Sequence, residues 1–140
     1  MRNAVASSAS DDLGKLVLRL ALGILVLLHG VAKITGGVGH IAGMLEKLGM
    51  PGSIAYLVLV GEVLAPLLVI IGAWTRLGAV LIIGNMLVAI GLVHMGELLT
   101  LGKTGGWALE LQGMFLFGAV AVALLGAGRY SLGGINGRLN

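Results

Sequence analysis

Four long apolar segments alternate with short polar links along the chain. The segments cover residues 13–34, 53–73, 77–99 and 107–127. A helix of about 20 residues spans a hydrocarbon core about 30 Å thick, and each segment is long enough to do so. The pattern therefore predicts four transmembrane helices. The very short link at residues 74–76 predicts that the second and third helices form an antiparallel hairpin.

The first link is long enough to carry a helix of its own. Apolar and polar residues recur in it at helical spacing, on opposite faces. The apolar ones are Val38, Ile41, Ala42, Leu45 and Leu48, and the polar ones are His40, Glu46 and Lys47. This pattern is typical of a short amphipathic helix lying on a membrane surface. The expected fold class is an all-α, integral membrane, antiparallel four-helix transmembrane bundle, with this short helix in the first, outer loop.

The distribution of positive charge predicts topology. With four spans, the side that holds both termini carries six Lys and Arg residues, and the opposite side carries three. The positive-inside rule then places both termini in the cytoplasm. We expect a flexible cytoplasmic N-terminus over residues 1–12, a single transmembrane domain over 13–130 and a cytoplasmic tail over 131–140.

Composition agrees with a membrane protein and excludes several chemistries. Hydrophobic residues make up 58% of the 140 residues and charged residues 11%, whereas soluble domains carry about 25% charged residues. The chain has no cysteine, so disulfides, Cys nucleophiles and thiolate-ligated metal or haem are not expected. The net charge of +3 is spread over helix ends, which indicates membrane topology and not a nucleic-acid surface.

Titratable side chains within the spans gather in the outer half of the expected bundle. At 1.5 Å per residue, His29 and His94 lie about 8 Å deep and Glu62 about 14 Å deep, whereas Glu97 and Glu110 lie only about 3–5 Å deep. Charged groups inside a span are costly and usually face the bundle interior. His29, Glu62 and His94 are therefore candidates for ligand binding or proton-linked chemistry.

Each of these residues also has a purely structural interpretation. Either histidine could hydrogen-bond a backbone carbonyl near the interface. Glu97 and Glu110 are expected at the periphery, and Lys33 is expected to anchor the interface by extending its ammonium outward.

Glu62 is the hardest of these residues to explain as an interface residue, because its side chain is too short to reach water from that depth. It must be protonated, paired or beside a wet cavity. Asn85 lies about 180° around the third helix from His94, so we expect it to form an interhelical hydrogen bond at a different interface.

Two kinds of site suit histidine and glutamate together. A quinone or another polar-headed lipophile would receive hydrogen bonds and exchange protons, with adaptable apolar walls from Met44, Met50, Met86, Met95, Met114 and Phe117. A metal held by His29, Glu62 and His94 is the alternative, because imidazole and carboxylate suit iron, zinc or manganese. The Glu-x-x-His pattern of bundle metal sites is reversed in His94-Met-Gly-Glu97, so no metal is the main expectation.

A faint internal repeat runs through the two expected hairpins. The first reads Arg19…His29…Glu62…Arg76, and the second reads Arg76…His94…Glu110…Arg129. The order suggests the hypothesis of a two-plus-two duplication.

Several short motifs in a fixed order resemble the DoxX family of small four-helix bacterial membrane proteins. They are Arg19-Leu-x-Leu-Gly23, His29-Gly30 with Lys33, Leu48-Gly-Met-Pro51, Glu62, Thr75-Arg76-Leu77, Met86 followed by His94, Gly105-Gly106-Trp107 and Gly126-Ala-Gly-Arg-Tyr-Ser131. In this sequence Ala65-Pro66 follows Glu62, where the family often has glycine, and the proline is expected to kink the helix.

The resemblance implies a component of a redox system in the bacterial inner membrane, since the family takes its name from a subunit of a thiosulfate:quinone oxidoreductase. The leading hypothesis is a membrane subunit that binds a quinone-like molecule in the outer half of the bundle. Glu62 would be the proton-linked group, with His29 and His94 as partners. The alternatives are a non-enzymatic scaffold or assembly factor for a partner protein, and a small-molecule or proton transporter. Catalysis, a redox protein partner and homo-oligomerisation stay open.

Overall fold

The computed structural model describes residues 7–140, and their regular structure is helical apart from one isolated bridge between Leu101 and Trp107. The α-helices are α1 (Ala9–Gly36), α2 (Gly39–Lys47), α3 (Leu57–Leu59), α4 (Ala65–Ile71), α5 (Thr75–Ala89) and α6 (Glu110–Leu125). Two π-helical segments, Val60–Leu64 and Ile90–His94, and two 3₁₀ segments, Gly52–Tyr56 and Met95–Glu97, join or extend them. The all-helical class predicted from the sequence is confirmed.

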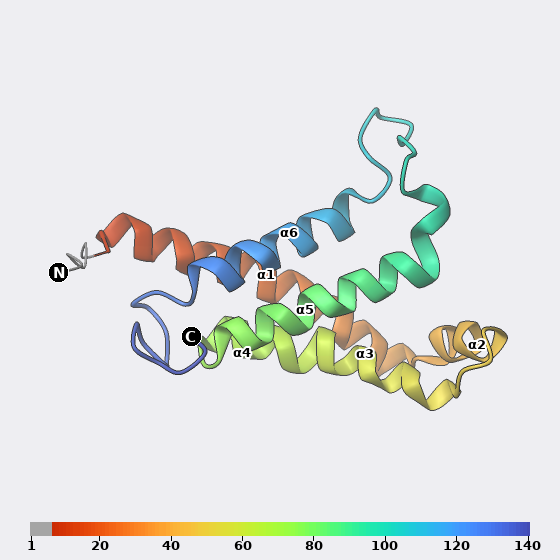
Figure 1. The fold of residues 1–140 in the computed structure, drawn as a ribbon, viewed down its shortest axis with the longest axis horizontal. Coiled ribbons are helices and arrows are strands. Elements are labelled where there is room, and N and C mark those ends of the chain that lie inside the picture. Colours follow the sequence, from red (N-terminus) through yellow and green to blue (C-terminus); the bar gives the residue numbers. More distant parts are fainter. Residues whose placement is uncertain (1–6) are drawn as a thin grey trace.

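The bundle consists of four antiparallel helical rods, each formed by one helix or by several consecutive helical segments (Figure 1). Three are long and apolar enough to cross a membrane, at 28 residues for Ala9–Gly36, 20 for Gly52–Ile71 and 23 for Thr75–Glu97. The fourth, α6, is apolar but has only 16 residues. The link before α6 projects from the bundle as a loop (Figure 1). The fourth helix begins at Glu110, three residues after residue 107, where the apolar pattern placed its start.

The first helix begins earlier than the apolar pattern predicts, at Ala9 and not at residue 13. A capping box explains the difference, because the N–H of Asp11 donates to Oγ of Ser8 and the N–H of Ser8 donates to the Asp11 carboxylate. Part of the N-terminus that we expected to be flexible is therefore helical. Residues 1–6 of that region lie outside the described residues.

Apolar side chains from α1, α4, α5 and α6 form one central core. Val26, Val69, Ile82 and Val122 are at most 1% exposed, and Ala119 is fully buried. Many large apolar side chains face outward instead, among them Val17, Leu124 and Phe117. An outward apolar surface of this extent is what a bilayer requires and water disfavours.

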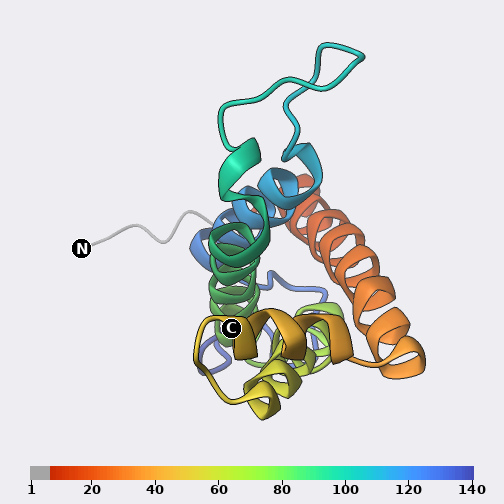
Figure 2. The same cartoon turned by 90° about the vertical axis from the view of Figure 1, so that its right-hand side faces the viewer.

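The predicted amphipathic helix is confirmed as α2. It lies across one end of the bundle, as the end-on view in Figure 2 shows. Leu45 of α2 packs with Val38 and with Ala55 of the 3₁₀ segment in a small second core. We call this the α2 end of the bundle, and we call the opposite end, which holds the start of α1 and the segment after α6, the terminal end.

Buried Arg19 organises the terminal end. Its guanidinium is 1% exposed and donates four hydrogen bonds of 2.8–3.0 Å to the carbonyls of Val69, Ile70, Ala127 and Tyr130. The last carbonyls of a helix have no partner within it. Arg19 supplies partners at the end of α4 and just beyond the end of α6.

The segment after α6 packs back onto the bundle. The N–H groups of Leu132 and Gly133 donate to the carbonyls of Ile71 and Gly72. Asn140 is 9% exposed, and its Oδ1 accepts from the hydroxyl of Thr75 at 2.7 Å. The expected tail 131–140 is therefore in contact with the helices.

Candidate functional site

A cavity of about 590 Å³ lies toward the α2 end. Its walls are mostly apolar and come from α1, α2, α3, α5, α6 and both π segments. Its polar side chains are His29, Lys33, His40, Glu62, Asn85, His94 and Gln112. A cavity of a few hundred Å³ with a few polar groups on apolar walls is typical of small-molecule sites.

The most buried polar group of the cavity wall is the Glu62 carboxylate. Glu62 is 5% exposed. Its Oε2 accepts a hydrogen bond from Nζ of Lys33, and its Oε1 accepts one from Nδ2 of Asn85 at 3.0 Å. Both oxygens are thus partnered, which offsets the cost of removing the charge from water. Three separate helical rods meet at this one carboxylate.

Two glycines allow these rods to approach so closely. A Cβ added at Gly30 would lie 2.1 Å from the carbonyl oxygen of Glu62, and one added at Gly61 would lie 2.5 Å from Cβ of Asn85. Neither position has room for a side chain. Glycine therefore sets the contact of α1 and α5 with the π segment, and this contact brings Lys33 and Asn85 within reach of Glu62.

Each π segment carries a candidate residue. Glu62 lies in Val60–Leu64 and His94 ends Ile90–His94. Pro66 has no N–H to donate to the carbonyl of Glu62, four residues earlier, as a regular α-helix would require. The π turn Val60–Leu64 lies just before this proline, and the kink expected there stays a prediction. Such turns occur often at functional sites, because they redirect side chains locally.

His94 lies between an exposed acid and a side chain of the cavity wall. Its Nδ1 is 2.8 Å from Oε2 of Glu97, and its Nε2 is 3.2 Å from Nε2 of Gln112. An amide nitrogen only donates. With the Gln112 amide assigned in this orientation, His94 Nε2 accepts and Nδ1–H donates to Glu97. His94 thus connects the cavity to a carboxylate whose side chain is 56% exposed.

His29 is on α1 and lines the same cavity. Its ring stands edge-on to the ring of Phe115, with centroids 5.6 Å apart and planes at 79°. This geometry suits aromatic pairs. The residue is exposed overall.

The structure brings all three main candidates, His29, Glu62 and His94, to one cavity. Lys33 differs from expectation, because it turns inward to Glu62 and does not extend outward as an anchor. Asn85 also differs, because it forms the expected interhelical hydrogen bond but does so within the site. The expected angle assumed a regular α-helix between Asn85 and His94, and the π segment changes that angle.

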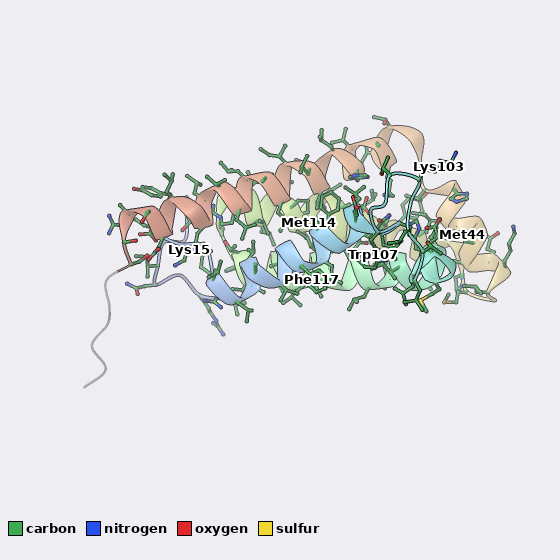
Figure 3. The ribbon with its side chains drawn as sticks, turned by 90° about the horizontal axis from the view of Figure 1, so that it is seen from above. Lys15, Met44, Lys103, Trp107, Met114 and Phe117 are labelled. Carbon is green, nitrogen blue, oxygen red and sulfur yellow. The ribbon has the colours of Figure 1, made fainter. Side chains whose placement is uncertain are left out.

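Of the other residues considered in the sequence, some line the cavity and some lie outside it. Glu97 contacts only the outer side of His94, and Glu110 is exposed and lies against Gly106, outside the cavity wall. Met44 and Met86 line the cavity. Met114 and Phe117 are exposed on α6 (Figure 3). Gln112 was missed, because its position beside His94 depends on how α6 packs.

No group of three or more His, Asp or Glu side chains that could hold a metal ion occurs within residues 7–140. His29, Glu62 and His94 share a cavity without converging in this way. The metal alternative at these residues therefore gains no support from their arrangement.

Comparison with known proteins gives two matches. A family model described as DoxX matches residues 14–95. The chain is 35% identical over 72 residues to the protein named "Putative oxidoreductase CatD" of Bacillus subtilis (strain 168). That alignment covers 51% of this chain and 53% of the relative, so the chain spans about half the length of the curated relative it matches. No solved structure matches the chain.

Proposed function

Because the chain belongs to the DoxX family, we propose that it is the membrane subunit of a redox system and binds a quinone-like molecule in the cavity at the α2 end. One observation carries the proposal: a buried carboxylate with two partners, Lys33 and Asn85, on the wall of a largely apolar cavity of about 590 Å³. The matched relative is named an oxidoreductase, which supports the redox class.

The cavity offers a quinone both apolar contact and hydrogen-bond donors. Phe115 and Met86 provide buried apolar walls against which a flat ring can pack. The Lys33 ammonium and the Asn85 amide are donors already directed at this wall. A quinone oxygen gains negative charge as it is reduced, and a fixed ammonium stabilises such charge in a site that excludes water.

Proton exchange would use two groups on the cavity wall. Glu62 can take or give a proton next to a bound oxygen, with Lys33 balancing its charge. His94 can pass a proton between the cavity and Glu97, whose side chain is largely exposed. In this proposal the electrons come from a separate carrier such as a partner redox protein, because the chain has no cysteine and therefore no redox-active thiol of its own.

The topology belongs to the same proposal. With four spans, the side that the sequence pattern gives to both termini carries six Lys and Arg residues against three, and this excess supports an inner-membrane protein with both termini in the cytoplasm. The cavity would then open toward the outer half of that membrane. Residues 13–130 would form the transmembrane domain, with the flanking residues in the cytoplasm.

Binding of short-chain quinones tests the proposal. Purified protein in detergent is titrated with decylubiquinone and with menadione, and tryptophan fluorescence quenching is measured. We expect Lys33→Met to weaken binding about tenfold, since it removes a charged hydrogen-bond donor. Glu110→Gln is the matched control, because Glu110 lies outside the cavity wall, and its affinity should equal that of the unaltered protein.

Equal affinities for all three proteins, or no binding of either quinone, would contradict the proposal. In that case, a partner protein co-purified from native membranes whose complex survives Glu62→Gln would favour the scaffold alternative.

A further inference from the structure

A second, smaller pocket of about 130 Å³ lies at the terminal end. It sits between the first turns of α1 and the segment that follows α6. The quinone proposal does not involve it. Four of its lining residues carry the argument, namely Ser7, Asp12, Lys15 and Arg76.

Asp12 lines this pocket and has one unsatisfied carboxylate oxygen. The residue is 1% exposed. Its Oδ1 accepts from the N–H of Arg129 at 3.1 Å. Within residues 7–140, its Oδ2 has no hydrogen-bond partner, and the nearest cation, Nε of Arg129, is 3.7 Å away. Oγ of Ser7, also buried on this pocket, likewise lacks a partner among these residues. A buried carboxylate oxygen in this state requires a donor.

Positive charge lines the same pocket. Figure 3 shows Lys15 extending from the first turns of α1 toward the segment after α6. A Cβ added at Gly128 would lie 3.1 Å from Cδ of Lys15 and 3.2 Å from Oδ1 of Asp12. The side chains of Lys15 and Asp12 therefore both pack against this glycine. Arg76 binds carbonyls through Nε and Nη1, while its Nη2 lies against Gly126 on the pocket wall.

The rim of the pocket is apolar, and exposed aromatic side chains lie at the same end of the bundle. Leu125 and Ile135 line it and are 50% and 60% exposed. Trp74 and Tyr130, at the same end, are also exposed, as aromatic side chains are at the headgroup level of a bilayer. A ligand of this pocket can therefore be polar at one end and apolar at the other.

We propose that this pocket binds the headgroup of a phospholipid that carries both a phosphate and a primary ammonium, as an ethanolamine phospholipid does. The ammonium donates to Oδ2 of Asp12, and the phosphate binds Lys15 and Arg76. The acyl chains run along Leu125 and Ile135. A glycerol headgroup brings no positive charge to the carboxylate, and a choline headgroup has no N–H to donate.

A lipid series tests this without altering the protein. Native mass spectrometry of delipidated protein measures the affinity for phosphatidylethanolamine, its N,N-dimethyl derivative, phosphatidylcholine and phosphatidylglycerol. We expect the ethanolamine lipid to bind about tenfold more tightly than the choline and glycerol lipids. The dimethyl derivative should bind nearly as well as the ethanolamine lipid, because it keeps one N–H. Equal affinity for the ethanolamine and choline lipids would overturn the proposal.

Variants locate the site. Asp12→Asn should abolish the preference for ethanolamine over choline. Lys15→Gln should weaken the binding of the ethanolamine and glycerol lipids equally, because it removes a contact with the phosphate that both lipids carry. Lys47→Gln is the control, because Lys47 is an exposed lysine on α2. It should change neither the preference for ethanolamine nor the affinity for either lipid. A preference that survives both Asp12→Asn and Lys15→Gln would place the lipid elsewhere and overturn the assignment. If Asp12→Asn does not fold, Lys15→Gln and the lipid series decide by themselves.

The soluble headgroup distinguishes a lipid from a free amine phosphate. Phosphoethanolamine, added without lipid, has no acyl chains to pack on Leu125 and Ile135. It should leave the midpoint of thermal unfolding unchanged, whereas the ethanolamine lipid should raise it. Stabilisation by phosphoethanolamine equal to that by the lipid would overturn the lipid assignment.

Discussion

The terminal end and the α2 end of the bundle are held together by different kinds of contact. At the terminal end, Arg19 and Arg76 donate to backbone carbonyls at helix ends, and little space remains. At the α2 end, side chains bind side chains across π turns, around a cavity of about 590 Å³. The terminal end fixes the positions of the helices and keeps only a small pocket of about 130 Å³, whereas the α2 end leaves a large cavity between the helices.

The two arginines make similar contacts in the two hairpins, while the duplication itself stays a hypothesis. Arg19 at the start of the first hairpin binds the carbonyls of Val69 and Ile70, near the end of α4. Arg76 at the start of the second binds the carbonyls of Ala123 and Leu124, near the end of α6. Gly72 and Gly126 then end these helices, each with φ of 76°. The two hairpins thus use the same contact at the terminal end.

The repeat does not extend to the α2 end. Glu62 lies in the middle of its rod and is buried against Lys33. Glu110, its counterpart in the sequence pattern, begins α6 and is exposed. The two histidines also differ, because His29 packs on Phe115 while His94 binds Glu97 and Gln112. The shared contact is structural, and the polar site occurs once.

The largest effect is expected from Arg19→Met. The substitution leaves four carbonyls at the ends of two helices without their donor. We expect a loss of about 3–5 kcal/mol in the free energy of unfolding, measured by denaturant or thermal unfolding in detergent. Arg138→Met is the control, because Arg138 is exposed. A loss below about 1 kcal/mol would mean that the terminal end does not depend on this contact.

A smaller effect is expected from Gly30→Ala. The added Cβ would meet the backbone of Glu62, 2.1 Å from its carbonyl oxygen, and backbone cannot move aside as a flexible side chain can. Overpacking of this kind costs about 1–3 kcal/mol, and it should also weaken quinone binding by separating Lys33 from Glu62. Gly14→Ala on the same helix has nothing within 4 Å and should leave both unfolding and binding intact. Equal behaviour of the two variants would contradict the close approach.

A coupling energy no larger than the effect of Gly30→Ala is expected from a double-mutant cycle of Lys33→Met and Glu62→Gln. Each single substitution leaves the other partner without its ion pair, whereas the double substitution removes both charges. We expect a coupling energy of about 1–3 kcal/mol in unfolding experiments. The same cycle for Lys47 and Glu110, which are both exposed, should give a value near zero. Additive effects at Lys33 and Glu62 would show that the pair does not stabilise the α2 end.

The amino-acid sequence by itself determined the membrane class, the rods, the amphipathic α2 and the set of titratable residues in one half of the bundle. These features follow from local pattern, because the length of an apolar run and the spacing of apolar residues act within a single segment. The depth estimated from the helical rise placed His29, Glu62 and His94 in the outer half of the bundle. In the structure these three residues line one cavity.

Only the tertiary structure decided which of these residues meet. Lys33 and Asn85 bind Glu62 across 29 and 23 residues of sequence, at a distance set by Gly30 and Gly61 on different rods. The π turns, which redirect Glu62 and His94, and the approach of Gln112 depend on the same packing. A helical pattern gives the direction of a side chain along a regular helix. The pattern does not give the distance between two helices or the position of a π turn. In this protein, those two features bring Lys33 and Asn85 to Glu62.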